Sequence, residues 1–450
     1  MKRFFPTLQR DASIKKVAVS QEGEIIASSP SAAAENGPLP ACVSRSEEDA
    51  ENQGPLRFMS WNANSFFLRI KNNLEEITSF IQRVDPDIIA IQEVRIPAAG
   101  RKGEPKNQGE MKDDTNPARD EKQIMMRALS RPPFGSYKTW WSLADTKYGG
   151  TALLVKHCFK PLSVKFSLDE IDIRKHETDG RAIIAEFEHF LLMNTYAPNN
   201  GWKEEELSFQ RRRNWDQRIL DFVLRISHKP LIWCGDLNVS HEEIDVSHPE
   251  FFKNARLPGY IPPRKEDCGQ PGFTQAERER FSKILKEGNL VDTYRWLQQQ
   301  KDMDGGFTWS GNPVGKYRGK RMRIDYFLIS NMLLPNLVKS TIHGRGIEME
   351  GFYGSDHCPI TMQLSYEQSP VENFEQGKAP QNSFAARKVV SSSVFYAQHK
   401  LSRGCMLHLP NIIPLKCSSA VNFLGYFMSI QFSKRRLVDE IHPSLFKEGT

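Results

Sequence analysis

The chain alternates short, strongly apolar runs with longer segments in which apolar residues recur every three or four positions. Such runs are typical of strands covered on both faces, and they occur at residues 57–62, 87–94, 151–156, 181–188, 190–198, 230–239, 323–330 and 358–364. Helical spacing occurs at residues 74–84, 204–226 and 274–288, where Leu74, Ile77 and Ile81, for example, fall on one helix face. This order of elements predicts an α/β fold with packed sheets inside and helices outside.

The two ends of the chain lack this pattern. Residues 1–55 are rich in Ser, Ala, Glu and Gly, and such a segment cannot bury enough apolar surface to offset its ordering entropy. We therefore expect a disordered N-terminal tail at 1–55 and a folded domain at 56–365. Residues 366–450 begin as a polar linker and continue without clear periodicity, as a C-terminal extension to which the sequence assigns no role.

Most predicted strands end in polar residues that a buried strand would not otherwise tolerate. Neighbouring strand ends meet at one rim of a sheet, where ligands usually bind. A single residue of this kind most often caps a helix or forms a turn, but a whole set is harder to explain in that way. The set consists of Asn62, Asn64, Glu93, Tyr196, Asn199, Asp236, Asn238, Asp325, Asp356 and His357.

Convergence of these carboxylates predicts a cation. Carboxylates that crowd together repel each other unless they share a proton or a metal ion. The set offers oxygen ligands and contains no Cys/His quartet, which favours Mg²⁺, with Mn²⁺ as the alternative, over Zn²⁺.

The composition excludes some classes of protein but does not indicate a function by itself. The formal net charge of +6 is too small to identify a polyanion-binding protein by itself, so the position of the basic residues matters more. Seven cysteines without a CxxC pair favour a reducing compartment and no structural disulfides. The N-terminus does not resemble a secretory signal, and no apolar run is long enough to span a bilayer, so we expect no membrane association.

Six segments, WNAN, IQEVR, NTYAPN, CGDLNV, RIDYFLIS and GSDHCPI, resemble the successive motifs of the exonuclease III family of apurinic/apyrimidinic endonucleases. This family lies within the endonuclease/exonuclease/phosphatase superfamily, and the chain is most similar to its plant endonuclease-like branch. The motifs occur in the family order and cover about residues 57–365. The resemblance implies a four-layer sandwich of two packed β-sheets flanked by helices. It also implies hydrolysis of the DNA phosphodiester 5′ to an abasic site, leaving a 3′-hydroxyl, together with cleaning of blocked 3′ ends.

The chemistry of phosphodiester hydrolysis then assigns roles to the motif residues. Glu93 is the predicted principal Mg²⁺ ligand, and Asp236 orients or deprotonates the attacking water. Asp325 pairs with His357 and favours its imidazolium form, which faces the scissile phosphate. The predicted catalytic set is Tyr196, Asp236, Asn238, Asp325 and His357, and the predicted metal set is Asn62, Glu93, Asp236, Asn238, Asp356 and His357.

Contacts to DNA are predicted in two places. Asn64, Tyr148, Arg181 and Asn199 resemble family positions near the phosphate or the DNA backbone. The loop at 315–323 is strongly basic, and its residues Lys316, Arg318, Lys320 and Arg321 form a predicted phosphate clamp, with a solvated basic loop as the alternative. Three consecutive arginines, Arg211, Arg212 and Arg213, are interpreted as an exposed helix face.

Two departures from the family pattern bear on substrate choice. Asn64 stands where relatives often carry an aspartate, which removes one charge from the metal site. Thr308, Met322 and Ile324, with Trp309 beside them, stand where abasic-site enzymes place large aromatic residues around the flipped sugar. A less aromatic pocket predicts readier acceptance of 3′-end lesions.

Other functions remain open on the sequence. A phosphoinositide or other phosphoester hydrolase of the same superfamily is the alternative enzyme, and a DNA-end-binding scaffold is the alternative outside catalysis. Met1, Phe4 and Phe5 match the apolar half of a sliding-clamp-binding peptide. We expect a monomer in the nucleus, with the plastid as the alternative.

Overall fold

Two six-stranded sheets form the frame of the described part of the chain. The computed structural model describes residues 54–365 apart from 102–104, 170–174, 200, 202–205, 227–228, 257–258, 299–305 and 313. These residues belong to one compact unit, Met1–Glu372. The predicted N-terminal tail up to residue 53, with its clamp-binding residues, and the predicted C-terminal extension lie outside the described residues.

The first sheet has the strand order β15-β16-β1-β2-β6-β5. Its strands are β1 (Arg57–Asn62), β2 (Ile88–Gln92), β5 (Tyr137–Ser142), β6 (Thr151–Lys156), β15 (Leu337–Ile342) and β16 (Ile360–Leu364). Strands β1 and β2 are parallel, and their last residues, Asn62 and Gln92, are paired. The carboxyl ends of both strands therefore lie at the same edge of this sheet.

The second sheet has the order β11-β14-β10-β9-β8-β7. Its strands are β7 (Ser163–Lys165), β8 (Ala182–Glu186), β9 (Leu191–Tyr196), β10 (Leu231–Asp236), β11 (Leu290–Asp292) and β14 (Asp325–Ser330). Strands β9 and β10 are parallel and end together at Tyr196 and Asp236. Strand β14 is antiparallel to β10, so its first residue, Asp325, pairs with Asp236. Three chemically important side chains thus share one sheet edge.

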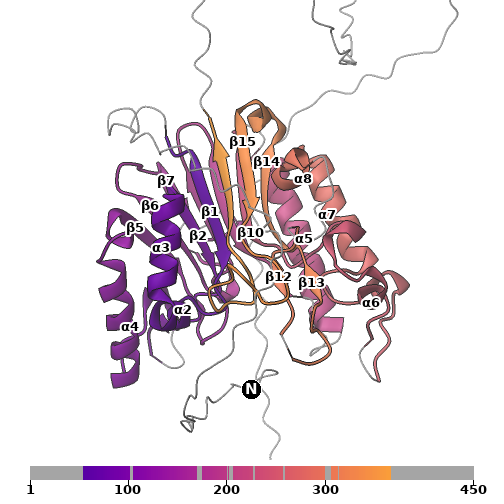
Figure 1. Cartoon of the computed structure of the whole chain (residues 1–450), viewed down its shortest axis with the longest axis horizontal. Helices are drawn as coiled ribbons and strands as arrows, with labels where there is room; N and C mark the ends of the chain where they lie inside the picture. The colour runs from indigo at the N-terminus through magenta and orange to yellow at the C-terminus, as the bar shows by residue number, and fades with distance from the viewer. Residues whose placement is uncertain are drawn as a thin grey trace, which may run out of the picture. The chain divides into compact units, whose positions relative to one another are not determined.

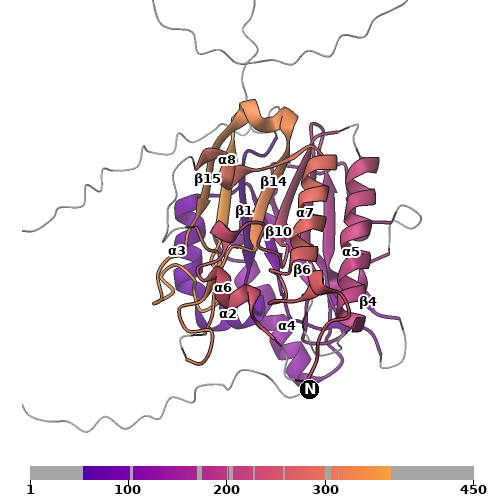
Figure 2. The same ribbon diagram turned by 90° about the vertical axis from the view of Figure 1, so that its right-hand side faces the viewer.

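Helices cover the outer faces of the sheets. Figure 1 shows α2 (Phe66–Asn72), α3 (Leu74–Val84) and α4 (Asn116–Leu129) on one side and α5 (Glu206–Arg225) and α7 (Gln275–Glu287) on the other. In Figure 2, α5 and α7 lie side by side over the second sheet. Shorter elements complete the unit: α6 (Pro249–Lys253), α8 (Thr293–Leu297), and the ribbons of β3 (Ala98–Ala99) with β4 (Asn107–Met111) and β12 (Trp309–Ser310) with β13 (Arg321–Met322). The predicted four-layer sandwich is confirmed.

The alternation of side chains along the strands divides the core into layers. On β1, Phe58 packs between the two sheets, whereas Met59 and Trp61 pack under the helices of the first sheet. The cluster between the sheets is apolar and joins residues such as Ile88, Leu192 and Phe327. Because the inner strands β2, β6, β9 and β10 bury both faces, their sequences read as continuous apolar runs, as the pattern predicted.

A connected set of buried hydrogen bonds crosses this apolar layer. The Gln92 side-chain nitrogen donates to Ser60 Oγ at 3.1 Å in its own sheet and to Asn194 Oδ1 at 2.7 Å in the other. Asn194 in turn donates to the carbonyl oxygen of Ala152 at 3.0 Å. All three side chains are fully buried, so these hydrogen bonds fix the register of one sheet on the other close to the edge where the polar strand ends meet.

Within the described residues, no helix combines the length and apolarity that crossing a bilayer requires. The four described cysteines, Cys158, Cys234, Cys268 and Cys358, are free thiols.

A buried ionic network holds the segment that leads into β14. Arg323, with 1% of its surface exposed, donates through Nε to Asp245 Oδ1 at 2.8 Å and pairs with Asp292 at 2.7 Å. Arg295 also pairs with Asp245. Burial alone would raise the pKa of Asp245, but the two guanidinium groups lower it to about 2. Arg323 is the last cation of the basic loop at 315–323, and its charge is paired inside the protein with Asp245 and Asp292.

This network gives a stability prediction. Replacing Asp245 by Asn leaves the buried Arg323 and Arg295 charges short of a partner, so the free energy of unfolding at pH 7 should fall by about 3 kcal/mol. The folded-state pKa lies below the unfolded value of about 3.9, so the stabilisation is present above that pH and disappears as the pH falls toward 2. Urea unfolding across this pH range measures the difference. Asp113→Asn, at an exposed pair with Lys122, is the control and should change nothing resolvable. An equal response of both variants would contradict the prediction.

Candidate active site

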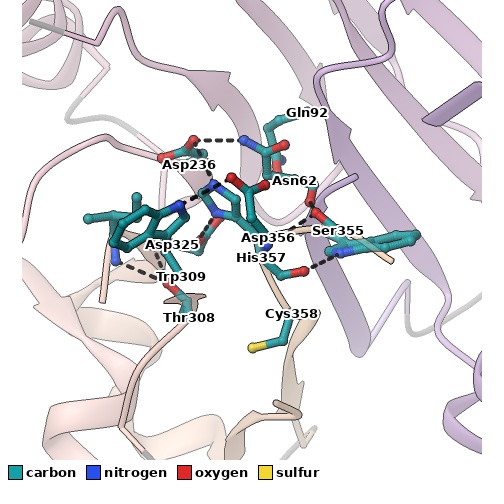
Figure 3. Close-up of polar contacts among 12 residues, drawn as sticks. Asn62, Gln92, Asp236, Thr308, Trp309, Asp325, Ser355, Asp356, His357 and Cys358 are labelled. Carbon is teal, nitrogen blue, oxygen red and sulfur yellow. Dashed lines mark hydrogen bonds and ion pairs between the residues drawn. The ribbon is translucent and has the colours of Figure 1, made fainter. Parts of the chain in front are cut away.

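The polar strand ends predicted from the sequence meet at one edge shared by the two sheets. Figure 3 shows Asn62 from β1, Asp236 from β10 and Asp325 from β14 side by side, with Asp356 and His357 from the loop before β16 facing them. Asn62, Asp236, Asp325 and His357 are each at most 5% exposed. The structure therefore brings the predicted residues into one buried polar cluster.

Asn62 connects the two sheets within this cluster. Its side-chain nitrogen donates to Glu93 Oε1 at 3.1 Å and to Asp236 Oδ2 at 2.8 Å. Glu93 follows β2 in the first sheet, and Asp236 ends β10 in the second. One amide thus spans two carboxylates, while its oxygen accepts from the backbone N–H of Asn64 at 3.0 Å and is held in place.

Glu93 carries a charge that its neighbours stabilise. Arg95 forms an ion pair with its Oε2 atom. Burial would raise the pKa of Glu93, but Arg95, the Asn62 amide, His357 and the Tyr196 hydroxyl together hold it below its usual value. Glu93 is therefore an ionised carboxylate inside the protein, the state that a metal ligand requires.

Asp325 and His357 form the predicted pair. His357 Nδ1 lies 2.9 Å from Asp325 Oδ2, and its Nε2 lies 4.0 Å from Asp236 Oδ2. Burial alone would lower the pKa of His357, but the adjacent Asp325 carboxylate raises it to about 10. The ring is therefore protonated at neutral pH. An imidazolium has no free lone pair, so in this state His357 is a hydrogen-bond donor, and its second predicted role, as a metal ligand, would require loss of this proton.

Asp236 has a different environment from Glu93. Burial raises the pKa of Asp236, and the nearby charge of Asp325 raises it further. The charge of His357 lowers the pKa in part, and the result is a value of about 7. Its Oδ1 atom accepts from the backbone N–H of Asn238 at 2.9 Å. Asn238 adopts a positive φ of 48°, which its short polar side chain tolerates, and this turn returns its amide toward the cluster. Asn199 donates to Asn238 Oδ1 at 3.3 Å, so both predicted phosphate-binding amides are adjacent.

Asp356 lies at the outer side of the cluster. Its two oxygens accept from Asn64 Nδ2 at 2.7 Å and from Trp309 Nε1 at 3.2 Å (Figure 3). Both donors are neutral, and the cationic side chains near Asp356 are Arg69, Arg95 and His357. Asn64, predicted near the DNA, here orients an acidic side chain.

The cluster fits a hard divalent cation. Four carboxylates, Glu93, Asp236, Asp325 and Asp356, face three cationic side chains, Arg69, Arg95 and His357, so the formal negative charge is in excess. Asp325 Oδ1 is buried and has no hydrogen-bond partner among the described residues. One carboxylate oxygen of Asp236 and one of Asp325 lie within 4.8 Å of each other. An excess of carboxylate oxygen and no cysteine suits Mg²⁺ or Mn²⁺.

Tyr196, Arg181 and Tyr148 form one group beside the cluster. The Arg181 guanidinium lies 5.0 Å from the centre of the Tyr196 ring and 5.7 Å from that of Tyr148. It also donates to the Tyr148 hydroxyl at 3.3 Å. Arg181 is only 5% exposed, whereas Tyr148 is 43% exposed, so Tyr148 is the outer member of this group and Arg181 its support.

The basic loop is divided between exposed and internally engaged residues. Lys316 and Arg318 are exposed, and Lys316 lies over the ring of Tyr317 at 4.8 Å. Lys320 lies over Phe251 and Arg321 over Phe307, each at 4.9 Å. The loop thus presents its outermost cations to solvent, while the others rest on aromatic rings.

The positions predicted to wall a sugar pocket are mostly internal. Thr308 is fully buried, and its hydroxyl accepts from the backbone N–H groups of Ile324 at 3.0 Å and Asp325 at 3.1 Å. Met322 and Ile324 are buried in a small apolar cluster against which Trp309 packs. Thr308 therefore fixes the start of β14, and with it the position of Asp325.

The sequence analysis missed Arg212, which holds two loops of the site together. Its guanidinium donates to the carbonyl oxygens of Pro198 at 3.1 Å, Leu237 at 2.9 Å and Asn238 at 3.0 Å. Its Nε atom pairs with Asp216 at 2.8 Å. Arg212 is 2% exposed, so its assignment to an exposed helix face is wrong, although Arg211 beside it is exposed. The available signal was the four-residue spacing from Arg212 to Asp216, which puts both on one face of α5.

The chain belongs to the Endonuclease/Exonuclease/phosphatase family, whose model matches residues 59–357. This confirms the resemblance on which the sequence analysis relied. A DNA-(apurinic or apyrimidinic site) endonuclease of Arabidopsis thaliana is 64% identical over 326 residues, which are 72% of this chain and 89% of the relative.

More distant relatives cover the same region. An exodeoxyribonuclease of Bacillus subtilis is 30% identical over 310 residues, which are 68% of this chain and 98% of the relative. Among solved structures, an AP endonuclease from Archaeoglobus fulgidus aligns with 69% of this chain and 100% of its own length, at 21% identity and a TM-score of 0.48.

The role of Arg212 gives a second prediction. Arg212→Met removes three hydrogen bonds to site carbonyls and one partner of Asp216, so the free energy of unfolding should fall by about 3 kcal/mol. The loops that it joins should also open more often. Urea unfolding measures the first effect, and amide hydrogen exchange at residues 197, 199 and 237–240 measures the second. Arg211→Met is the matched control on the exposed side of α5. Unchanged exchange in the Arg212 variant would show that the loops hold without it.

Proposed function

We propose that this protein is a Mg²⁺-dependent DNA repair endonuclease that hydrolyses the phosphodiester 5′ to abasic sites and leaves a 3′-hydroxyl. The observation that carries the proposal is the single Asn62 amide that joins Glu93 and Asp236 opposite the Asp325–His357 pair. The relative from Arabidopsis thaliana carries this activity in its name and is 64% identical, which supports the same reaction class here.

The residues divide the reaction between them. Asp236 accepts the proton of the attacking water, because it is the carboxylate whose pKa burial raises toward neutrality. Protonated His357 donates to a phosphoryl oxygen and stabilises the charge that develops there. Asn238 and Asn199 supply neutral amides that orient the phosphate, and Glu93 with Asp356 would hold the ion. When bound, Mg²⁺ supplies Lewis-acid stabilisation of the phosphate and of the leaving oxygen.

DNA binding is proposed along two surfaces beside this cluster. Tyr148, supported by Arg181, lies on one side. The exposed Lys316 and Arg318 of the basic loop lie in the segment that precedes β14. Both can contact backbone phosphates, which position a duplex without reading its sequence.

Removal of blocked 3′ ends is proposed as a second activity of the same site. The positions of the expected sugar-pocket aromatics carry Thr308, Met322 and Ile324, and their side chains are buried. Without a bulky aromatic wall, discrimination between an abasic sugar and a terminal 3′-phosphate rests on fewer contacts.

The remaining proposals concern the cellular setting. We propose that the protein acts as a monomer in the nucleus, with the plastid as the alternative. Sliding-clamp binding through Met1, Phe4 and Phe5 stays a prediction, because these residues lie outside the described part of the chain.

The metal requirement is the first test of this proposal. Excess EDTA should abolish incision of an abasic duplex, and added Mg²⁺ should restore it. Glu93→Gln should raise the Mg²⁺ concentration for half-maximal rate by at least about tenfold, because it loses a charged ligand. Glu287→Gln, at the end of α7, is the matched control. Initial rates over a Mg²⁺ series give both values, and an unchanged half-maximal concentration in the Glu93 variant would remove this residue from the metal site.

The second test separates the candidate functions. Incision is measured on abasic, 3′-phosphate, 3′-phosphoglycolate and undamaged duplexes, with a phosphoinositide assayed in parallel. The proposal expects turnover on the abasic and 3′-blocked duplexes only, and Asp236→Asn should reduce it about 10³-fold. Release of phosphate from the phosphoinositide alone would favour the alternative hydrolase. DNA binding without turnover would favour a scaffold, and a strong preference for abasic over 3′-blocked duplexes would reject the end-cleaning proposal.

A further inference from the structure

The segment Glu93 to Arg95 is held rigidly beside the carboxylate cluster. The carbonyl oxygen of Glu93 accepts from the backbone N–H groups of Ser65 at 3.0 Å and Phe66 at 3.1 Å. The backbone N–H groups of Val94 and Arg95 donate to Gly150 and Gly149, each at 3.0 Å. The side chains that leave this segment therefore start from fixed backbone positions.

Two residues of this short segment adopt an unusual backbone conformation. Glu93 and Arg95 both have a φ of 55°, in the left-handed region that is unfavourable for residues other than glycine. The conformation brings the Arg95 side chain back toward Glu93, two residues earlier. Strained backbone of this kind persists only where the surrounding structure holds it, and here it goes together with the ion pair between Arg95 and Glu93.

Both oxygens of Glu93 are engaged in this state. Oε1 accepts from the Asn62 amide at 3.1 Å, and Oε2 forms the ion pair with the Arg95 guanidinium. The Glu93 side chain is 10% exposed, whereas 35% of the Arg95 side chain is exposed. The arginine thus closes the solvent side of the carboxylate and can withdraw into water.

A divalent cation and the guanidinium compete for this carboxylate. Mg²⁺ and Mn²⁺ bind carboxylate oxygens directly, at about 2.0–2.2 Å, and a positive group on the same oxygen opposes them. The other anionic groups near Arg95 include Asp356, also a predicted ligand. An arginine in this place therefore replaces part of the ion's charge when the ion is absent.

We propose that Arg95 is an internal counter-cation of the metal site, which holds Glu93 in position without the ion and must release Oε2 when the ion binds. Arg95 therefore lowers the affinity of the site for the divalent ion. It also keeps the Glu93 side chain ordered when the ion is absent. This inference rests on the proposed function for the identity of the ion. Arg95 acts through Glu93 and is a positioning residue.

Metal affinity of the protein without DNA tests this inference directly. Binding of Mn²⁺ is measured by isothermal titration calorimetry and by the electron paramagnetic resonance signal of free Mn²⁺, and neither readout depends on turnover. Arg95→Met should bind Mn²⁺ about 10-fold more tightly than the unsubstituted protein, because one opposing charge is gone. Its melting temperature should be lower without the ion and should rise more than that of the unsubstituted protein when Mn²⁺ is added.

Three further variants make the outcome decisive. Arg95→Gln removes the charge but keeps a donor, so it should also bind more tightly, and it serves if the Met variant folds poorly. Arg95→Lys keeps the charge and should bind with nearly unchanged affinity. Arg127→Met, on the exposed face of α4, removes a charge elsewhere and should have no effect.

Two results would overturn the inference. One is equal or weaker Mn²⁺ binding in both the Met and the Gln variant, and the other is a Lys variant that binds as tightly as they do. If the unsubstituted protein binds Mn²⁺ and fails to incise any duplex, the proposed function fails while the role of Arg95 can still be upheld. If it incises and the neutral variants bind no more tightly, only the role of Arg95 fails.

Discussion

The amide of Asn62 is the contact on which the site depends, because it joins carboxylates that belong to different sheets. Glu93 follows β2, Asp236 ends β10, and nothing in the local chain brings them together. The two carboxylates can approach each other only if the strand ends of the two sheets are aligned. The buried hydrogen bonds of Gln92 to Ser60 and Asn194 fix this alignment. A shift of one sheet along the other would separate the carboxylates and remove the site.

Buried charge is the second constraint, and the molecule meets it with cations placed beside each carboxylate. Arg95 faces Glu93, and His357 faces both Asp325 and Asp236. The balance is incomplete, since an excess of negative charge remains at the predicted metal site. Without internal cations at this site, the carboxylates would become protonated or move apart in the absence of the divalent ion. The arrangement therefore keeps the carboxylates close together and leaves room for a divalent ion.

Two further arginines act on the loops rather than on the substrate. Arg212 donates hydrogen bonds to three carbonyl oxygens in the loops after β9 and β10. Arg323, just before β14, forms ion pairs with Asp245 and Asp292. Loops that carry a site are usually the most mobile part of a fold. Here guanidinium groups with several donors satisfy carbonyls and carboxylates that secondary structure leaves without partners. Positive charge in this protein thus serves internal order as well as the proposed contacts to DNA.

The sequence alone predicted the four inner strands of each sheet and the helices α3, α5 and α7, since a strand inside a sheet and the inward face of a helix have to be apolar. The edge strands β5, β7, β11 and β15 and the helix α4 lack so clear a pattern and were not predicted. It also predicted that the polar side chains at the strand ends would gather at one edge, because a charged or amide side chain at the end of an apolar run needs a reason to be there. It could not determine which arginines are buried. Arg211 and Arg212 are neighbours of the same type, yet one is exposed and the other is enclosed by Pro198, Leu237 and Asn238. That difference, like the position of Arg95 on Glu93 and of Thr308 under β14, depends on backbone groups distant in the sequence, and only the packing of the two sheets brings them within reach.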